Sequence, residues 1–251
     1  MNAVLGPLGA AAKRLRAVVV HNFNTGSADE ATVITRADEV AANRDRIYGI
    51  WPGVSVATAL GNVGTDSAAY AAGLIARMDN ERGFWWSPSN QTIAGIGGVV
   101  HPVDFALGDS SSLADILNGE HIATIVRKDG FRLWGNRTLE KTDPKWRFLS
   151  VRRIADILND TLLENHLWAV DRNITRTYLE NVTDGVNAFI RQLQAQGAIL
   201  GGRCLPNPDL NTPESIALGH VHFDFEFTPA TPAEKITFRS ALVNDYIEEI
   251  L

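Results

Sequence analysis

The chain has 251 residues, of which 45% are hydrophobic and 21% charged, and its formal net charge is −6. This size allows one large hydrophobic core or two closely packed ones. The apolar runs are far shorter than the roughly 20 residues of a membrane span, the first 15 residues lack a secretory pattern, and the acidic balance argues against nucleic acid as the principal partner. The single cysteine, Cys204, is typical of a protein that folds in a reducing cytoplasm.

The first part of the chain predicts helices that alternate with short strands. Helices are expected over residues 7–16, 30–42 and 68–81, strands over 17–20 and 46–51, and a strand or hairpin arm over 54–62. This order opens with a βαβ unit. Glycines 95, 97 and 98 lack the spacing and the strand–turn–helix frame of a phosphate-binding loop, so we interpret them as a structural turn.

The segment from residue 125 to residue 157 is basic, although the chain as a whole is acidic. Asp129-Gly130 lies between two apolar-bearing runs and predicts a β-hairpin. Between Arg127 and Arg153 there are nine Lys or Arg and three Asp or Glu, a local charge of +6, so the rest of the chain carries −12. A protein divided in this way could attract another copy of itself, an acidic partner or nucleic acid.

The second half predicts long helices followed by strands. A short helix is expected over 112–118, amphipathic helices over 151–170 and 175–196, and strands over 220–227 and 235–243. The alternation of apolar and polar side chains in 220–227 is typical of a half-buried strand. Residues 209–251 hold eight acids and two bases, so this tail has a charge of −6, opposite in sign to the basic segment.

No constellation of residues predicts catalysis or a bound cofactor. His220 and His222 would share one strand face as half of a metal site, but no further ligand accompanies them. The nucleophile elbow GxSxG does not occur, and Cys204 has no histidine at an interpretable spacing. We therefore predict no catalytic, cofactor-binding or metal-binding residues.

The loop that follows Trp134 has a more specific pattern, Gly-Asn-Arg-Thr. Asn136 and its neighbouring glycine favour tight backbone geometry, and Arg137 could donate hydrogen bonds to several carbonyls and brace the loop against the sheet. We predict that Trp134, Asn136 and Arg137 form a structural loop; the alternative is an Arg137 that faces a partner.

Six short motifs occur in order along almost the whole chain. They are GFWWSPSN (83–90), IAG (93–95), WGNRT (134–138), FLSVRR (148–153), GAILGG (197–202) and EKITFR (234–239). Together they resemble the tail sheath proteins of contractile bacteriophage tails and of the related R-type bacteriocins. The resemblance implies a structural protein that has no enzymatic activity and binds no cofactor.

In that family, identical subunits stack as rings around an inner tail tube and rearrange into a shorter, wider helix that drives the tube through a bacterial envelope. The resemblance therefore implies a homo-oligomer of sheath subunits. Its other partners would be the tail tube protein and the baseplate and tail terminator proteins, with no nucleic acid and no insertion into a membrane. The subunit would be assembled in the cytoplasm of the bacterial host and become part of the virion.

Extended terminal arms in the family complete a β-sheet in a neighbouring subunit, and main-chain hydrogen bonds supply the attachment. The resemblance assigns this self-assembly role to five residues of the C-terminal arm: Ile236, Phe238, Arg239, Val243 and Tyr246. It assigns contact with an acidic tube to three arginines: Arg172, Arg176 and Arg191. The family's N-terminal arm and outer region are absent from this sequence.

Residues and resemblance together predict an α/β (α+β) fold, in which helices flank a mixed β-sheet and a C-terminal extended strand serves as an arm that completes a sheet between subunits. We expect an α/β core over residues 1–205 and a C-terminal strand region with the arm over 206–251, packed on the same core. A strand pair at the end of a chain is a poor hairpin in water and a good candidate for pairing with a larger sheet.

Two other classes of protein stay open. A nucleotide- or NAD-dependent α/β enzyme is favoured only by the βαβ start and the scattered glycines. A nucleic-acid-binding protein would use the basic segment, above all Arg127, Lys128 and Arg132, and its binding would weaken steeply with salt.

Overall fold

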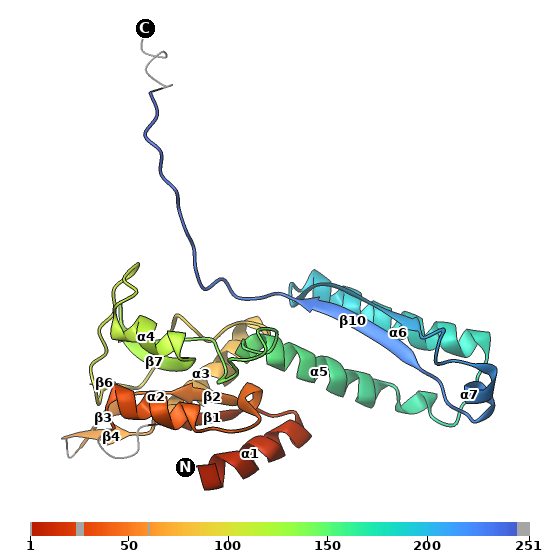
Figure 1. The fold of residues 1–251 in the computed structure, drawn as a ribbon, viewed down its shortest axis with the longest axis horizontal. Coiled ribbons are helices and arrows are strands. Elements are labelled where there is room, and N and C mark those ends of the chain that lie inside the picture. Colours follow the sequence, from red (N-terminus) through yellow and green to blue (C-terminus); the bar gives the residue numbers. More distant parts are fainter. Residues whose placement is uncertain (1, 24–27, 60, 245–251) are drawn as a thin grey trace.

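The computed structural model describes residues 2–23, 28–59 and 61–244. Figure 1 shows a compact body at the N-terminal side, an elongated body that contains α6 and β10, and an extended segment near the C-terminus. Helix α5 (Leu149–Asn165) runs from the first body into the second. We call these parts the central body (residues 2–148), the C-terminal body (149–229) and the arm (230–244).

A five-stranded mixed sheet forms the middle of the central body. Its strands are β1 (Val19–Asn22), β2 (Ile47–Ile50), β7 (Ile122–Arg127), β8 (Phe131–Trp134) and β5 (Gln91–Thr92), in the spatial order β1-β2-β7-β8-β5. The first three are parallel, and β8 and β5 are antiparallel to their neighbours. Asp129 and Gly130 have φ values of 48° and 102°, as a tight hairpin turn requires. The hairpin predicted at this dipeptide is confirmed.

Helices cover both faces of this sheet, because successive residues of a strand point to opposite sides. Ile47 belongs to a buried cluster with residues of α1 (Asn2–Leu15), α2 (Glu30–Asp38) and α4 (Leu113–Gly119). Tyr48 belongs to a second cluster with residues of α3 (Ser67–Arg82) and the first residue of α5. The predicted mixed sheet flanked by helices is therefore confirmed.

A smaller antiparallel sheet lies at the edge of the central body. It consists of β3 (Val54–Thr58), β4 (Gly61–Thr65) and β6 (Gly98–Val99), in the order β4-β3-β6. The backbone N–H of Gly97 donates to the carbonyl of Ser55 at 2.8 Å, so the glycine-rich segment belongs to this sheet. No helix begins directly after it, in agreement with a structural turn.

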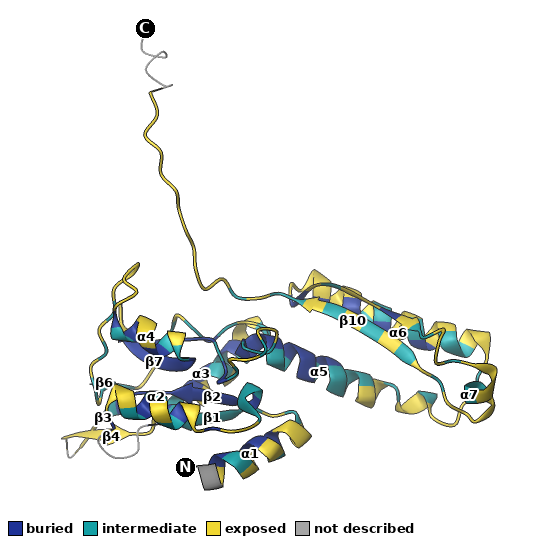
Figure 2. Cartoon of the chain, viewed as in Figure 1, coloured by how far each residue is buried: buried dark blue, intermediate teal, exposed yellow. Residues whose placement is uncertain are grey.

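The C-terminal body is a β-hairpin packed on two helices. After α5 come the 3-10 turn η2 (Leu167–Ala169), α6 (Arg176–Ala195), β9 (Ile199–Pro206), α7 (Pro213–Ala217) and β10 (Phe223–Pro229). A third buried cluster combines side chains of α5, α6 and β9, and the three phenylalanines of β10 pack against it. Figure 2 shows the alternation of burial along β10, which confirms the pattern predicted from the sequence.

The arm differs most from the sequence-based expectation. Residues 235–243, predicted as a strand, have no regular secondary structure, because no described strand lies beside them to accept their hydrogen bonds. His220 and His222 precede β10 and do not share a strand face. The domain boundary predicted between residues 205 and 206 falls inside the β9–β10 hairpin, whose strands pair from Phe223 with Pro206 onward.

Candidate assembly site

The outer part of the arm, residues 235–244, carries exposed apolar side chains and forms no hydrogen bond or ion pair with the rest of the described chain. Ile236 and Phe238 are 71% and 91% exposed, and the predicted Arg239 and Val243 are exposed as well. Tyr246 lies outside the described residues. Burying a large apolar side chain stabilises by about 1.5–3 kcal/mol, so this segment is a surface that gains by association.

The β9–β10 hairpin offers an open edge along β10. It is a sheet of two strands, and no other described strand pairs with either of them. On β9, the side chain of Asn187 in α6 accepts from the N–H of Cys204 and donates to its carbonyl, at 2.8 and 3.0 Å. Within it the strands lie close together at Gly202, where a Cβ atom would stand 2.5 Å from the carbonyl oxygen of Glu226. Unpaired edges present rows of N–H and C=O groups that can template an added strand.

The Trp134–Arg137 loop connects the central sheet to α5. Trp134 packs edge-on against Phe105 with ring centroids 4.7 Å apart, and the carbonyl of the buried Asn136 accepts from the N–H of Leu149 at 2.9 Å. Burial raises the pKa of the Tyr48 phenol well above its ordinary value, so Tyr48 stays protonated and donates to the carbonyl of Gly135 at 2.7 Å. These contacts hold the loop in one position.

Arg137 contacts a side chain rather than backbone carbonyls. Its Nε and Nη2 donate to Oε1 and Oε2 of Glu234 at 2.6 and 2.5 Å. The expectation that Arg137 braces the loop by binding several carbonyls is wrong in this respect. Sequence spacing gave no signal for the pair, because 97 residues separate the two side chains.

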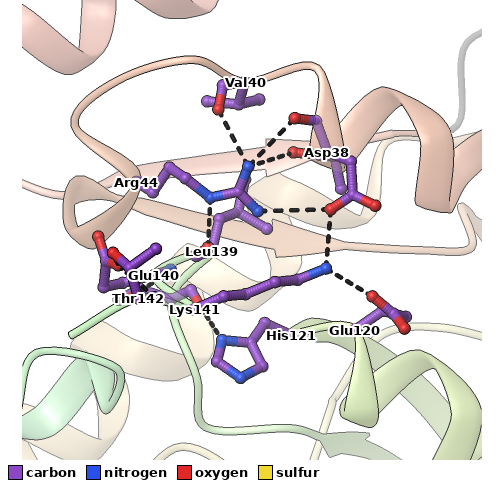
Figure 3. A network of polar contacts seen from close by, with 11 residues as sticks. Asp38, Val40, Arg44, Glu120, His121, Leu139, Glu140, Lys141 and Thr142 are labelled. Carbon is purple, nitrogen blue, oxygen red and sulfur yellow. Dashed lines mark hydrogen bonds and ion pairs between the residues drawn. The ribbon is translucent and has the colours of Figure 1, made fainter. Parts of the chain in front are cut away.

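Lys141 joins three elements of the central body (Figure 3). Its Nζ contacts carboxylate oxygens of Asp38, at the end of α2, and of Glu120, just after α4, at 2.7 and 2.5 Å. Burial alone would lower the pKa of Lys141, but the hydrogen bonds that it donates to the two carboxylates, together with their negative charges, raise it overall. Beside it, the Nε of Arg44 donates to the carbonyl of Leu139 at 2.7 Å, so the network fixes the chain that follows β8.

The basic segment is partly neutralised inside the protein. Four of its nine bases form ion pairs with acids from other parts of the chain or from the segment's own helix: Arg137 with Glu234, Lys141 with Asp38 and Glu120, Arg152 with Asp45 and Asp156, and Arg153 with Asp79. Arg132 also donates to two backbone carbonyls, those of Lys128 and Asn90. The local charge of +6 counted in the sequence therefore overstates the positive potential at the surface.

A buried ion pair ties α5 to the central body. Nη1 of Arg46 donates to Oδ2 of Asp156 at 2.5 Å, and the two side chains are 6% and 5% exposed. Arg152 donates to the other carboxylate oxygen at 3.1 Å and its guanidinium lies 4.0 Å from the ring centroid of Trp146. Burial lowers the pKa of Arg152, and the charges of Asp156 and Asp45 oppose this shift.

The three arginines predicted to face a tube do not form one cluster. Arg172 lies before α6 and donates to the carbonyl of Trp168, whereas Arg176 begins the helix and pairs with Glu180 at 2.9 Å. Arg191 is exposed near the other end of α6, about 22 Å further along the axis at 1.5 Å per residue. Any surface that meets all three must follow the length of this helix.

The described residues contain no group of three or more His, Cys, Asp or Glu side chains placed to hold a metal ion. None of the helices in the described ranges is both long and apolar enough to span a membrane.

Two models of one protein family match successive parts of this chain. Residues 4–139 match the family model of the phage tail sheath protein central domain, and residues 141–242 match that of the phage tail sheath C-terminal domain. The putative prophage major tail sheath protein of Pseudomonas aeruginosa (strain UCBPP-PA14) is 41% identical over 99% of this chain and 64% of its own length. The tail sheath protein of Escherichia phage P2 is 36% identical over 74% of this chain and 46% of its own length.

Solved structures have the same fold. The baseplate of the anti-feeding prophage contains a chain that superimposes with a TM-score of 0.78 and 22% identity, covering 96% of this chain and 65% of that chain. A sheath complex of an extracellular contractile injection system, in the contracted state, gives a TM-score of 0.76 and 20% identity over 90% of this chain and 64% of that chain. This chain thus spans less than two thirds of the length of these relatives. Since the two family models together match residues 4–139 and 141–242, the chain belongs to the phage tail sheath protein family.

Proposed function

We propose that this protein is a structural subunit of a contractile tail sheath, which polymerises in helical rings around a tail tube and contracts to drive the tube through a bacterial envelope. The observation that carries the proposal is the combination of exposed apolar side chains in the arm and a two-stranded hairpin with an open edge at β10. Each copy then both offers a strand and accepts one. Such heterologous contacts do not close on themselves and build helical assemblies.

Attachment between copies would use the backbone of the arm. Ile236 and Phe238 have the same parity in the sequence, so they point to one side of an extended strand. In an added strand they would be buried against the neighbour while Arg239 faces away. The unpaired hydrogen-bonding groups on the outer edge of β10 supply the attachment, and the side chains supply the register.

The outer surface of α6 is the face we assign to the tube, with Arg172, Arg176 and Arg191 as its basic contacts. Glu180 pairs with Arg176, and this pair is largely exposed, so an acidic partner can compete for the arginine. Further partners in this proposal are the baseplate and the tail terminator. The subunit would be assembled in the host cytoplasm and act as part of a virion or a related tail-like particle.

Contraction would move each subunit as a rigid body while the arms stay paired. Residues of α5 belong to buried clusters of both bodies, and the Arg46–Asp156 pair holds this helix to the central body. Packed interiors resist continuous deformation, so the change between two lattices should occur at contacts between subunits. Extensive refolding of residues 125–200 between the extended and contracted states would contradict this mechanism.

Electron microscopy of the protein co-expressed with its tube protein tests the proposal. Sheaths around tubes, or empty polymeric sheaths, are the expected result, and deletion of residues 235–251 should abolish them. A control replaces two exposed polar residues of α6 that the proposal does not use, Asn181 and Gln192, with Ala. A full-length protein that remains monomeric beside its tube at all concentrations would refute the proposal.

A further inference from the structure

We propose that Arg137 and Glu234 form a clasp that sets the direction in which the arm leaves the protein, and thereby which neighbour it reaches. The inference rests on the proposed function, because it assigns a positioning role within arm-mediated assembly. Two parallel hydrogen bonds, of 2.6 and 2.5 Å, join the guanidinium of Arg137 to the carboxylate of Glu234. The paired geometry fixes the relative orientation of the two groups as well as their distance.

Glu234 is the last residue of the described chain that the body holds. Pro229 at the end of β10 pairs with Ile199, and the N–H of Ala230 donates to the carbonyl of Ala198 at 3.2 Å. The next contact is the ion pair of Glu234, and residues 235–244 form no hydrogen bond or ion pair with the described protein. Without the ion pair, the free segment would begin four residues earlier, at residue 231.

The other half of the clasp is firmly positioned. Arg137 forms an isolated β-bridge with Phe148, and the N–H of Thr138 donates to the carbonyl of Arg147 at 2.7 Å. The side chains of Arg137 and Glu234 are 25% and 26% exposed, so water screens the pair less than a fully exposed one. The arm is therefore fastened to a rigid part of the central body.

The two fixed points of the arm lie on different bodies. Ala230 is held by the C-terminal body, whereas Arg137 belongs to the stretch that matches the central domain model, residues 4–139. Loss of the ion pair would leave only the hydrogen bond of Ala230 and would thus free the base of the arm to turn. Residues 235–244 extended at about 3.3 Å per residue span roughly 33 Å, so a turn of about 20° moves the tip by about 11 Å. That displacement exceeds twice the spacing of about 4.8 Å between paired strands.

Distance distributions between two spin labels on the monomeric full chain test the clasp. One label replaces Lys235, the exposed first residue after the clasp, and the other replaces Asn80, which is exposed on α3, while the buried Cys204 is replaced by Ala. We expect a narrow distribution in the otherwise unaltered chain and a distribution at least twice as wide in Glu234→Gln. Arg137→Lys, which keeps the charge and loses the planar fork, should also widen it.

Two further variants separate positioning from general destabilisation. Glu226→Gln breaks a different Arg–Glu contact, the exposed pair with Arg203 inside the C-terminal body, and should leave the distribution narrow. The exchange Arg137→Glu with Glu234→Arg should restore much of the narrow distribution. An unchanged width in Glu234→Gln, with the circular dichroism spectrum of the parent, would overturn the clasp.

Assembly supplies the second readout. If the parent chain forms sheaths with its tube, Glu234→Gln should reduce their number at least threefold, and the charge exchange should recover it. Should the parent form no sheath although Glu234→Gln widens the label distribution, the proposed function fails while the clasp stands. Normal sheaths together with an unchanged distribution in Glu234→Gln would reject the clasp and leave the proposed function intact.

Discussion

Removing the carboxylate of Asp156 should destabilise the protein far more than removing that of Asp160, one turn further along α5. Asp156 is 4% exposed and contacts both Arg46 and Arg152. Asp156→Ala would leave two guanidinium groups, with side chains 6% and 12% exposed, without this counter-charge. Asp160 pairs only with Arg16, and those side chains are 47% and 34% exposed.

The expected losses in the free energy of unfolding differ several-fold between Asp156→Ala and Asp160→Ala. Breaking a buried ion pair by removing one partner reduces the free energy of unfolding by about 3–5 kcal/mol. Breaking an exposed pair changes it by at most about 1 kcal/mol. For a chain of this size each kcal/mol shifts Tm by about 2–4 °C, so Asp156→Ala should lower Tm by about 6–20 °C and Asp160→Ala by no more than about 4 °C.

Urea denaturation followed by tryptophan fluorescence measures both variants, since the chain has six tryptophans. Asp156→Asn serves as a third variant, because it keeps the shape and some hydrogen bonds and should fall between the parent and Asp156→Ala. Equal losses for Asp156→Ala and Asp160→Ala would refute the view that the buried pair fastens α5 to the central body. A thermal scan at the same pH provides the independent Tm.

Three other substitutions have expected outcomes. Gly135→Ala should reduce the free energy of unfolding in urea by about 1–3 kcal/mol, because φ is 135° and a Cβ would stand 2.6 Å from Oδ1 of Asn118; a neutral effect would contradict this packing. Phe238→Ala should leave monomer stability within about 0.5 kcal/mol of the parent and still abolish sheaths seen by electron microscopy, whereas normal sheaths would remove Phe238 from the assembly surface. Burial, assisted by the charge of Arg137, lowers the pKa of His121 from 6.5, so stability should fall as the pH drops below about 6.5; His121→Gln should flatten urea midpoints measured between pH 7 and pH 5, and an unchanged slope would reject this assignment.

Local sequence patterns predicted the turns, helices and strand faces that depend on residues close together in the sequence. The Asp129-Gly130 turn follows from backbone preferences of two residues. The helix expected over 68–81 corresponds to α3, and its start depends on a single side chain, since Asp66 accepts from the N–H of Ala68 at 2.7 Å. The inward face of β10 follows from the period of two in a strand. Each of these depends on neighbours within a few positions.

Contacts between distant residues could not be read in the same way. Arg46 and Asp156 are 110 residues apart, and no spacing rule connects them. Formal charge along the basic segment was misleading for the same reason, because the acids that neutralise Lys141 and Arg153 come from α2, α3 and the end of α4. The predicted strand in the arm failed because strand propensity needs a partner edge, and the chain leaves the arm without one.

The packed bodies of this chain and its extended outer segment meet at residues 230–234. On one side lie three buried clusters, two of which share α5, so the two bodies resist relative deformation. On the other side, residues 235–244 form no hydrogen bond or ion pair with the rest of the described chain. Pro229 and Pro232 have fixed φ angles, so rotation is confined to the few residues between and after them. If the proposed function holds, a subunit that stays linked to its neighbours in two lattices would adjust at these residues, and the proposed Arg137–Glu234 clasp would determine which adjustment is favoured.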